Sequence, residues 1–297
     1  MDSVLRGNVL FALAAAVLWG GGDFSGGMGV KAGCGGVRAG LRVVLLSHVT
    51  SFTVLSAIAS LRGDAFPHGA PLAWGIAAGV AGGLSLTGFY IALSRGAMGA
   101  SAAISGLLAA AIPVAVAMGM SGSPGGRPLI GFAVAGVAIW MIAAEDSPSG
   151  VVTERSTMVL ATLAGVGFGL YFVALKMASV AGLVWPMATA RIGSISTCSV
   201  LTVVLWIVSR RRGEAAERVV NRRVALWVLG TALLDTSGNL LFMAATRAGR
   251  LDVAAVLASL YPASTILLAA LTLREHPTRR QAIGMMTAVV AVVLIAL

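Results

Sequence analysis

The chain has 297 residues, of which 58% are hydrophobic and only 11% are charged. Because soluble globular domains carry about 25% charged residues, this composition excludes a soluble domain, a disordered chain and a disulfide-stapled secreted protein. The apolar runs are about twice as long as the ~10-residue alternating strands of a membrane barrel. The predicted fold class is therefore an all-α integral membrane protein.

The formal net charge is +10, from 21 Lys and Arg residues against 11 Asp and Glu residues. The cations lie between apolar runs rather than on one folded face, which argues against a nucleic-acid partner. Basic residues beside membrane spans orient helices and meet anionic lipid. Cys34 and Cys198 lie in or beside apolar runs without CxxC spacing, so we expect buried free thiols.

In chain order, ten apolar stretches separated by turn residues or charges are predicted to cross the membrane. The first run is longer than the core of a signal peptide, so we expect a retained helix. No loop is long enough for a soluble domain, which places any chemistry in or between helices. The predicted spans are Gly7–Met28, Val37–Leu61, Leu72–Ser94, Ala100–Met120, Leu129–Ala144, Met158–Ser179, Trp185–Val208, Val224–Thr246, Val253–Leu273 and Gln281–Leu297.

Four landmarks recur in the same order at a nearly constant offset, which predicts an internal repeat with halves 1–150 and 151–297. Five spans per half force the second half to enter from the opposite side. Such an inverted repeat is typical of carriers that bind their substrate near mid-membrane between the halves. The pairs are Trp19-Gly20 with Phe168-Gly169, Arg95 with Arg247, Pro113 with Pro262, and Gly131 with Gly284.

Ten spans place both termini on one side of the membrane. Lys and Arg are far more frequent in the odd-numbered loops, so the positive-inside rule puts those loops in the cytoplasm and the termini outside. Moving one pair of span boundaries would reverse this assignment, which leaves the orientation open.

Ionisable residues deep in apolar helices usually face a cavity or a partner. Five residues meet this description: Asp23, Arg42, Lys176, Arg191 and Asp235. Asp23 follows three glycines, which allow close backbone approach, and a low dielectric disfavours its charged form, so it suits proton coupling. The alternative interpretation is that Asp23 already lies at a span end.

Asp235 and Asn239 share one helix face at i, i+4 spacing. With Thr231 and Ser237 they predict a polar stripe facing a cavity, while the alternative is an interhelical contact that sets packing. Arg42 and Arg191 each lie six residues into a span. We expect them to pair with an aspartate or to snorkel, and the alternative is recognition of a substrate carboxylate.

Four aromatic residues lie in or near spans, where they either line a cavity or pack helices together. They are Trp19, Tyr90, Tyr171 and Tyr261. Pro262 is expected to break the helix beside Tyr261, and Pro113 to act likewise in the first half. His48 is interpreted as a packed, hydrogen-bonded residue. Lys176 is expected to snorkel, and Gly75, Gly79 and Gly83 are expected to make close helix contacts.

Several of these residues belong to stretches that resemble the EamA-type helices of the drug/metabolite transporter superfamily. The stretches are Trp19-Gly20-Gly21-Gly22-Asp23-Phe24, Asp235-Thr236-Ser237-Gly238-Asn239 and Ser259-Leu260-Tyr261-Pro262. The resemblance implies a ten-helix carrier with a central cavity that exports small metabolites, amino acids or drug-like molecules. Such carriers are usually drawn with both termini in the cytoplasm. Glu275 has no counterpart in the first half, so we interpret its role as structural.

The leading hypothesis is a secondary exporter in the cell (inner or plasma) membrane, either coupled to protons through Asp23 or Asp235 or uncoupled. There is no P-loop, so ATP does not drive it directly, and we expect no cofactor and no metal. The partners are a small-molecule substrate, the lipid bilayer and protons, in a monomer or homodimer. The alternatives are an intramembrane protease or lipid phosphatase, and a facilitator or channel.

Overall fold

The computed structural model describes residues 2–33, 36–94, 98–143, 155–212, 221–273 and 278–296, and every regular element in this part of the chain is helical. The prediction of an all-α membrane fold is confirmed. The elements are α1 (Asp2–Ala32), α2 (Gly36–Arg62), α3 (Ala70–Ser94), α4 (Met98–Ser121), α5 (Gly126–Ala143), α6 (Arg155–Ala178), the 3-10 turn η1 (Ser179–Ala181), α7 (Val184–Arg211), α8 (Arg222–Ala248), α9 (Leu251–Ala258), α10 (Tyr261–Leu273) and α11 (Arg279–Ala296).

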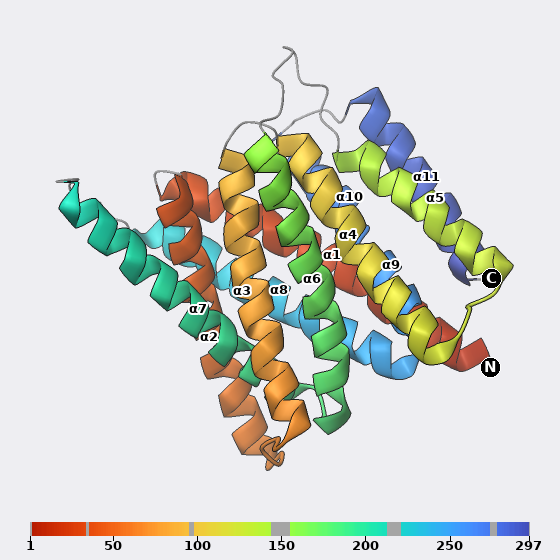
Figure 1. The fold of residues 1–297 in the computed structure, drawn as a ribbon, viewed down its shortest axis with the longest axis horizontal. Helices are drawn as coiled ribbons and strands as arrows, with labels where there is room; N and C mark the ends of the chain where they lie inside the picture. Colours follow the sequence, from red (N-terminus) through yellow and green to blue (C-terminus); the bar gives the residue numbers. More distant parts are fainter. Residues whose placement is uncertain are drawn as a thin grey trace.

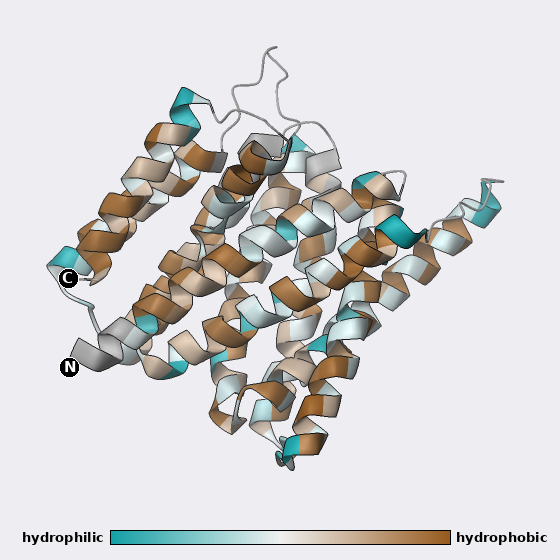
Figure 2. Cartoon of the chain, turned by 180° about the vertical axis from the view of Figure 1, so that it is seen from behind, coloured by the Kyte–Doolittle hydropathy of each residue, from teal (hydrophilic) through white to brown (hydrophobic). Residues whose placement is uncertain are grey.

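Each of the ten predicted spans has a helical counterpart. Within the described ranges, nine helical segments are long and apolar enough to cross a membrane, and the shorter apolar helix of α5 makes the tenth. Large apolar side chains such as Leu10, Leu163 and Met286 are exposed on the outside of the bundle. Figure 2 shows apolar residues along the helices and hydrophilic ones mostly near helix ends. A surface of this kind suits hydrocarbon rather than water.

The ninth span is broken into α9 and α10, which are separated by Ser259 and Leu260. The break lies just before Pro262, as predicted, because proline has no N–H to donate to the preceding turn. The corresponding expectation for Pro113 is wrong, since α4 continues through this residue. Proline removes one backbone hydrogen bond, and the close packing of α4 on Gly165 and Gly169 of α6 holds the helix together around it.

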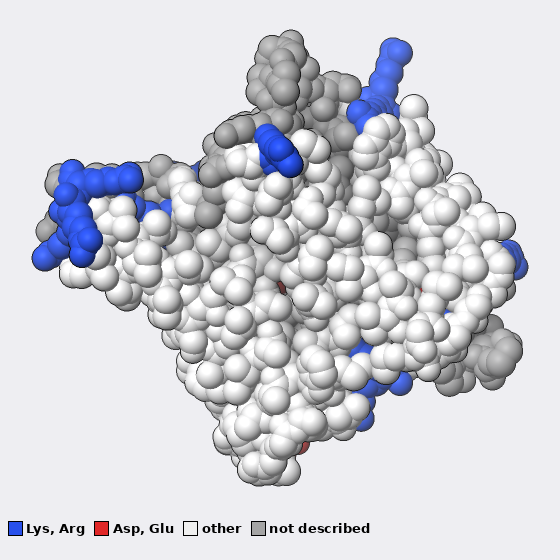
Figure 3. All heavy atoms as spheres, viewed as in Figure 1, with Lys and Arg blue, Asp and Glu red and all other residues white. Residues whose placement is uncertain are grey.

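The connections that follow the even-numbered spans gather at the end of the bundle where the chain starts, which we call the even end. They are the α2–α3, α4–α5, α6–α7 and α8–α9 connections. There Asn8 donates to the Ala245 and Arg250 carbonyl groups at 2.8 and 3.2 Å, and Trp185 donates to the Asp64 carbonyl at 2.8 Å. In Figure 1 the N- and C-termini lie on the same side of the molecule. The other end, where α7 ends and α8 begins, is called the odd end. Figure 3 shows Lys and Arg at the margins of a largely uncharged face.

Small residues bring helices into backbone contact. A Cβ at Gly79 of α3 would overlap the Ala190 carbonyl of α7, and a Cβ at Gly193 of α7 would overlap the Ile76 carbonyl of α3. Without a hydrophobic driving force between helices in lipid, such close contact supplies much of the packing energy. The predicted close contacts at Gly75, Gly79 and Gly83 are confirmed, all three against α7.

Contacts between the two halves come in reciprocal pairs. Gly131 of α5 packs against Ile295 of α11, while Gly284 of α11 packs against Ile142 of α5. The same sequence offset relates both members of one contact to the members of the other. Two halves related by a two-fold axis would give this pattern, because a contact between i and j would then imply one between their equivalents. The pairing α1 with α8 is likewise matched by α6 with α3.

The α3–α7 crossing predicts the response to a single methyl group. Gly79→Ala should lower the free energy of unfolding by about 1–3 kcal/mol, because neither backbone can move away without separating the helices. Gly119→Ala on α4 is the control, since a Cβ there meets no atom within 4 Å. Thermal unfolding of both variants in detergent should show a lower transition temperature for Gly79→Ala alone. Equal stability of the two variants would contradict the close crossing.

The ten crossings predict opposite accessibility for the two ends. We expect His68→Cys and Ser123→Cys, which are exposed at the even end, to react with an impermeant thiol reagent from one face of sealed vesicles. Arg212→Cys and Arg279→Cys should react only from the other face. Both native cysteines are replaced beforehand. Labelling of all four positions from one face would rule out ten crossings.

Candidate functional site

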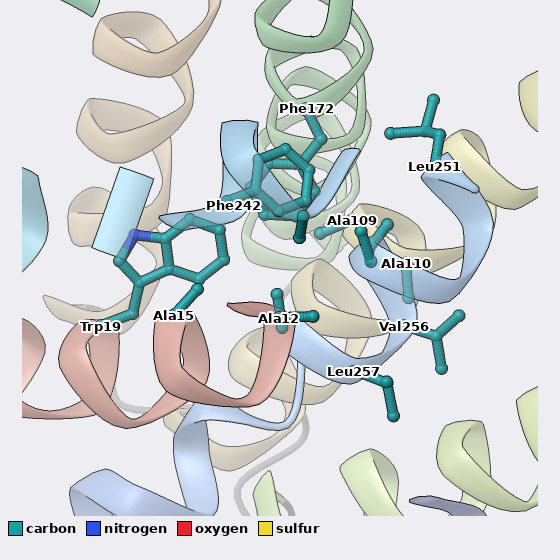
Figure 4. Close-up of a cluster of buried hydrophobic side chains, with 14 of the residues drawn as sticks. Ala12, Ala15, Trp19, Ala109, Ala110, Phe172, Phe242, Leu251, Val256 and Leu257 are labelled. Carbon is teal, nitrogen blue, oxygen red and sulfur yellow. The ribbon is translucent and has the colours of Figure 1, made fainter. Parts of the chain in front are cut away.

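An aromatic cluster lies where α1, α6 and α8 meet. The indole of Trp19 is stacked on Phe172, with ring centroids 5.2 Å apart and planes 3° apart, and its centroid lies 5.5 Å from that of Phe242. Tyr261 meets the indole edge-on at 6.4 Å. Gly238 leaves room for the indole on α8. Figure 4 shows Trp19, Phe172 and Phe242 converging on one cluster. Because Trp19 is only 7% exposed, it packs helices together rather than lining an open cavity.

A partly buried ion pair lies beside this cluster, since the Asp235 side chain is 33% exposed. Arg191 of α7 is 4% exposed, and its Nη2 donates to Oδ2 of Asp235 on α8 at 2.5 Å. Its Nε donates to the hydroxyl of Ser51 on α2 at 3.0 Å, and the Ser51 and Thr236 hydroxyl oxygens lie 2.6 Å apart. A buried guanidinium requires such partners, since an unpaired charge in this interior would be costly. The expected pairing of Arg191 with an aspartate is therefore confirmed.

The polar network extends from Asp235 to α6. Asn239 donates from Nδ2 to the Asp235 carbonyl at 2.8 Å and accepts a hydrogen bond from the Tyr171 hydroxyl at 2.7 Å. Asp235 and Asn239 thus share one face, as predicted. Ser237 does not, because it lies on the exposed stripe with Leu233, and two helical residues turn a side chain by about 200°. The predicted polar stripe excludes Ser237.

Asp23 is the accessible carboxyl group next to this network. It lies one turn after Trp19 on α1, where the buried face that carries Trp19 borders the exposed face of the helix. A Cβ at the neighbouring Gly22 would lie 3.2 Å from the Asp235 backbone nitrogen, which shows how closely α1 and α8 approach here. The Asp23 side chain is exposed although protein atoms crowd around it, a combination expected in a recess. Among the described side chains it has no ion-pair partner, and it interacts electrostatically with Asp235.

The exposed face of α1 continues from Asp23 towards the odd end. Gly27 and Lys31 follow at i+4 spacing and are exposed, and no atom lies within 4 Å of a Cβ built on Gly27. At the even end Lys176 donates to the Thr246 carbonyl, so it is held against α8 rather than extending freely to the membrane surface. The exposed stripe of α1 therefore leads from Asp23 to the odd end.

The other residues singled out in the sequence do not join the network of Arg191 and Asp235 among the described residues. Arg42 is half-buried on α2, nine residues before Ser51, which corresponds to ~13 Å along a helix. Tyr90 belongs to α3, but its side chain lies outside the described residues, as do Glu275 and Cys34. Cys198 is a buried free thiol, as expected.

Two members of the site were not found by sequence reasoning. Ser51 is one of many hydroxyl residues in apolar helices, and only its contact with Arg191 distinguishes it. His48 lies one turn earlier and interacts electrostatically with Arg191. His48 is packed in the interior, as expected, but the expected hydrogen bond is absent at Nδ1, which has no partner in the part of the chain that the structure describes. No group of three His, Cys, Asp or Glu side chains in that part could hold a metal ion.

Comparisons with known proteins agree with the fold. A crystal structure of a protein with 14% sequence identity superposes with a TM-score of 0.73, over 97% of this chain and 95% of its own, which shows a shared fold. No curated protein matches the chain. The family model described as the EamA-like transporter family matches residues 155–297, which include α6 to α11 and hence Arg191, Asp235 and Asn239. Residues 155–297 are therefore similar to the EamA-like transporter family, a family of membrane transporters, and the helices of this chain suit a multi-pass membrane protein.

Proposed function

We propose that the protein exports small organic molecules, such as metabolites, amino acids or drug-like compounds, across the cell membrane by alternating access. In this proposal residues 1–150 and 151–297 form two inverted repeats that move against each other. The reciprocal contacts of Gly131 with Ile295 and of Gly284 with Ile142 support a two-fold relation between the halves.

The observation that carries the proposal is the accessible carboxyl group of Asp23 beside a neutralised ion pair. Arg191 and Asp235 balance each other, so Asp23 is the acidic group left to bind a proton or a substrate. Its host α1 belongs to the first half, whereas Asp235 on α8 belongs to the second. A ligand bound at Asp23 would therefore sense the relative position of the halves, which coupling requires.

Contacts at the even end support a state that is closed on that side. The Arg250 guanidinium pairs with the fully buried Asp252, with Nη2 and Oδ2 2.7 Å apart, and also donates to the Ser121 and Gly122 carbonyls at 3.3 and 2.7 Å. These bonds join the start of α9, in the second half, to the end of α4, in the first. Opening the even end would have to break the bonds from Arg250 to the Ser121 and Gly122 carbonyls. Asp23 would then be accessible from the even end instead of the odd end.

Asp23→Asn tests proton coupling. In proteoliposomes loaded with a panel of radiolabelled amino acids and a fluorescent dye, wild-type efflux of a transported compound should accelerate with an imposed pH gradient. The asparagine cannot release a proton, so the variant should lose this acceleration and at least ~10-fold of its efflux rate. Glu217→Gln, in the α7–α8 connection, is the control.

Two results would contradict the proposal. If Asp23→Asn responds to the gradient as the wild type does, Asp23 does not couple transport to protons. If compounds leave the vesicles chemically altered, the protein is an enzyme rather than a carrier. Unaltered compounds with saturable counterflow would support a carrier over a channel.

The Arg191–Asp235 pair predicts strong energetic coupling. Arg191→Gln and Asp235→Asn should each destabilise the protein, since each leaves a charge without its partner, while the double variant should lose less than the sum. We expect a coupling free energy of about 1–3 kcal/mol from thermal unfolding in detergent. The Arg62–Asp64 pair, whose side chains are 63% and 32% exposed, should give under ~1 kcal/mol. Additive effects at Arg191 and Asp235 would show that the pair does not hold α7 to α8.

A further inference from the structure

A pocket lies at the even end, away from Asp23. It has a volume of about 350 Å³ and is lined by the α2–α3 connection, the start of α7 and the end of α8. Such a volume is within the range of small-molecule sites, about 300–1,000 Å³. Among its lining residues are Arg62, Asp64, Gly182, Trp185 and Arg247.

The charges around this pocket favour an anion. Two arginines line it against one aspartate, and that aspartate already faces Arg62, with Nε and Oδ2 3.4 Å apart. Arg247 has no ion-pair partner among the described residues, and Lys176 lies near enough to interact with it electrostatically. Guanidinium groups bind phosphate oxygens through paired N–H donors, which makes a phosphate group the matching ligand.

The start of α7 adds backbone donors to the same pocket. The helix runs for 28 residues from Val184, and no side chain caps its N-terminus. Val184 and Trp185 line the pocket, and the first amide groups of a helix have no intrahelical acceptor. The indole N–H of Trp185 donates to the Asp64 carbonyl, which ties the α2–α3 connection to α7 and shapes the pocket wall. The Val184 and Trp185 amides beside two arginines strengthen the preference for an anion, whereas Pro186 has no N–H to add.

Exposed apolar residues adjoin two of the pocket residues in the sequence. Leu61, next to Arg62, is 88% exposed, and Val180, next to the pocket residue Ala181, is 71% exposed. Phe66 packs edge-on against Trp185, with ring centroids 5.1 Å apart. Aromatic rings at a helix end are typical of the headgroup level of a bilayer. Exposed arginines at the pocket, with exposed apolar residues next to them in the sequence, fit a phosphate that carries acyl chains better than a free ion.

We propose that the pocket between Arg62 and Arg247 binds the phosphate headgroup of an anionic phospholipid. The two guanidinium groups and the first amides of α7 donate hydrogen bonds to the phosphate oxygens, while the acyl chains lie along Leu61 and Val180. The site is separate from the Asp23 recess and does not depend on what the carrier exports.

Native mass spectrometry of the full chain in detergent tests this site, with phosphatidylglycerol and phosphatidylcholine as probes. The wild type should retain phosphatidylglycerol in preference, and Arg247→Gln and Arg62→Gln should each weaken its binding about fivefold, since one basic residue contributes about 1 kcal/mol at a membrane surface. Arg247→Lys should restore part of the affinity. Arg127→Gln, an exposed arginine at the same end but outside the pocket, should bind as the wild type does.

A second arm uses inorganic phosphate alone. Millimolar phosphate should release phosphatidylglycerol from the pocket of the wild type, but not from other surface sites such as the one around Arg127. This result would support recognition of the phosphate group. Two results would overturn the proposal: equal retention of both lipids by the wild type, or unchanged phosphatidylglycerol binding in Arg247→Gln and Arg62→Gln that unfold at the wild-type temperature. Phosphate binding without any preference for the anionic lipid would reject the lipid as the ligand.

Discussion

In hydrocarbon, every backbone polar group needs a partner within the protein, and this constraint governs the architecture of the chain. It makes each span a helix, and it leaves helix association to close packing and a few polar contacts. Glycines at the α3–α7 crossing and at the α5–α11 pair let backbones touch. Two places depart from this regular packing. The break before Pro262 adjoins Tyr261, which contacts Trp19, and the recess at Asp23 lies on α1, which also carries Trp19.

The interior keeps its few charges in two different ways. Arg191 and Asp235 neutralise each other within hydroxyl groups from α2 and α8, so their charge is satisfied inside the protein. Asp23 lies next to them without an ion-pair partner among the described residues and remains accessible. In the proposed mechanism the fixed pair and the free carboxyl group have separate tasks: the pair holds α7 to α8 within the second half, and the carboxyl group is left to exchange protons or ligands.

The even end carries both the contacts that join the two halves and the pocket proposed to bind a lipid headgroup. The Arg250 bonds to α4 and the Asn8 bonds to the end of α8 join the halves at this end. The phosphate pocket of Arg62 and Arg247 lies at the same end, where α7 and α8 also meet the α2–α3 connection. A lipid bound there would contact segments from both halves, so its occupancy would bias how readily the even end opens.

The sequence by itself determined the number and order of the helices, the break near Pro262 and the chemical types present in the interior, because composition, span length and proline chemistry are local properties. It also singled out Arg191 and Asp235, since charges in apolar spans are rare, and placed Asn239 on the same helix face as Asp235. Only the tertiary structure decided which groups meet. It placed Trp19 in packing rather than in an open cavity, brought Ser51 and His48 to Arg191, and turned Ser237 outward. The reason is physical: a residue's partners depend on helix rotation and crossing distance, and these are set by contacts between segments far apart in the chain.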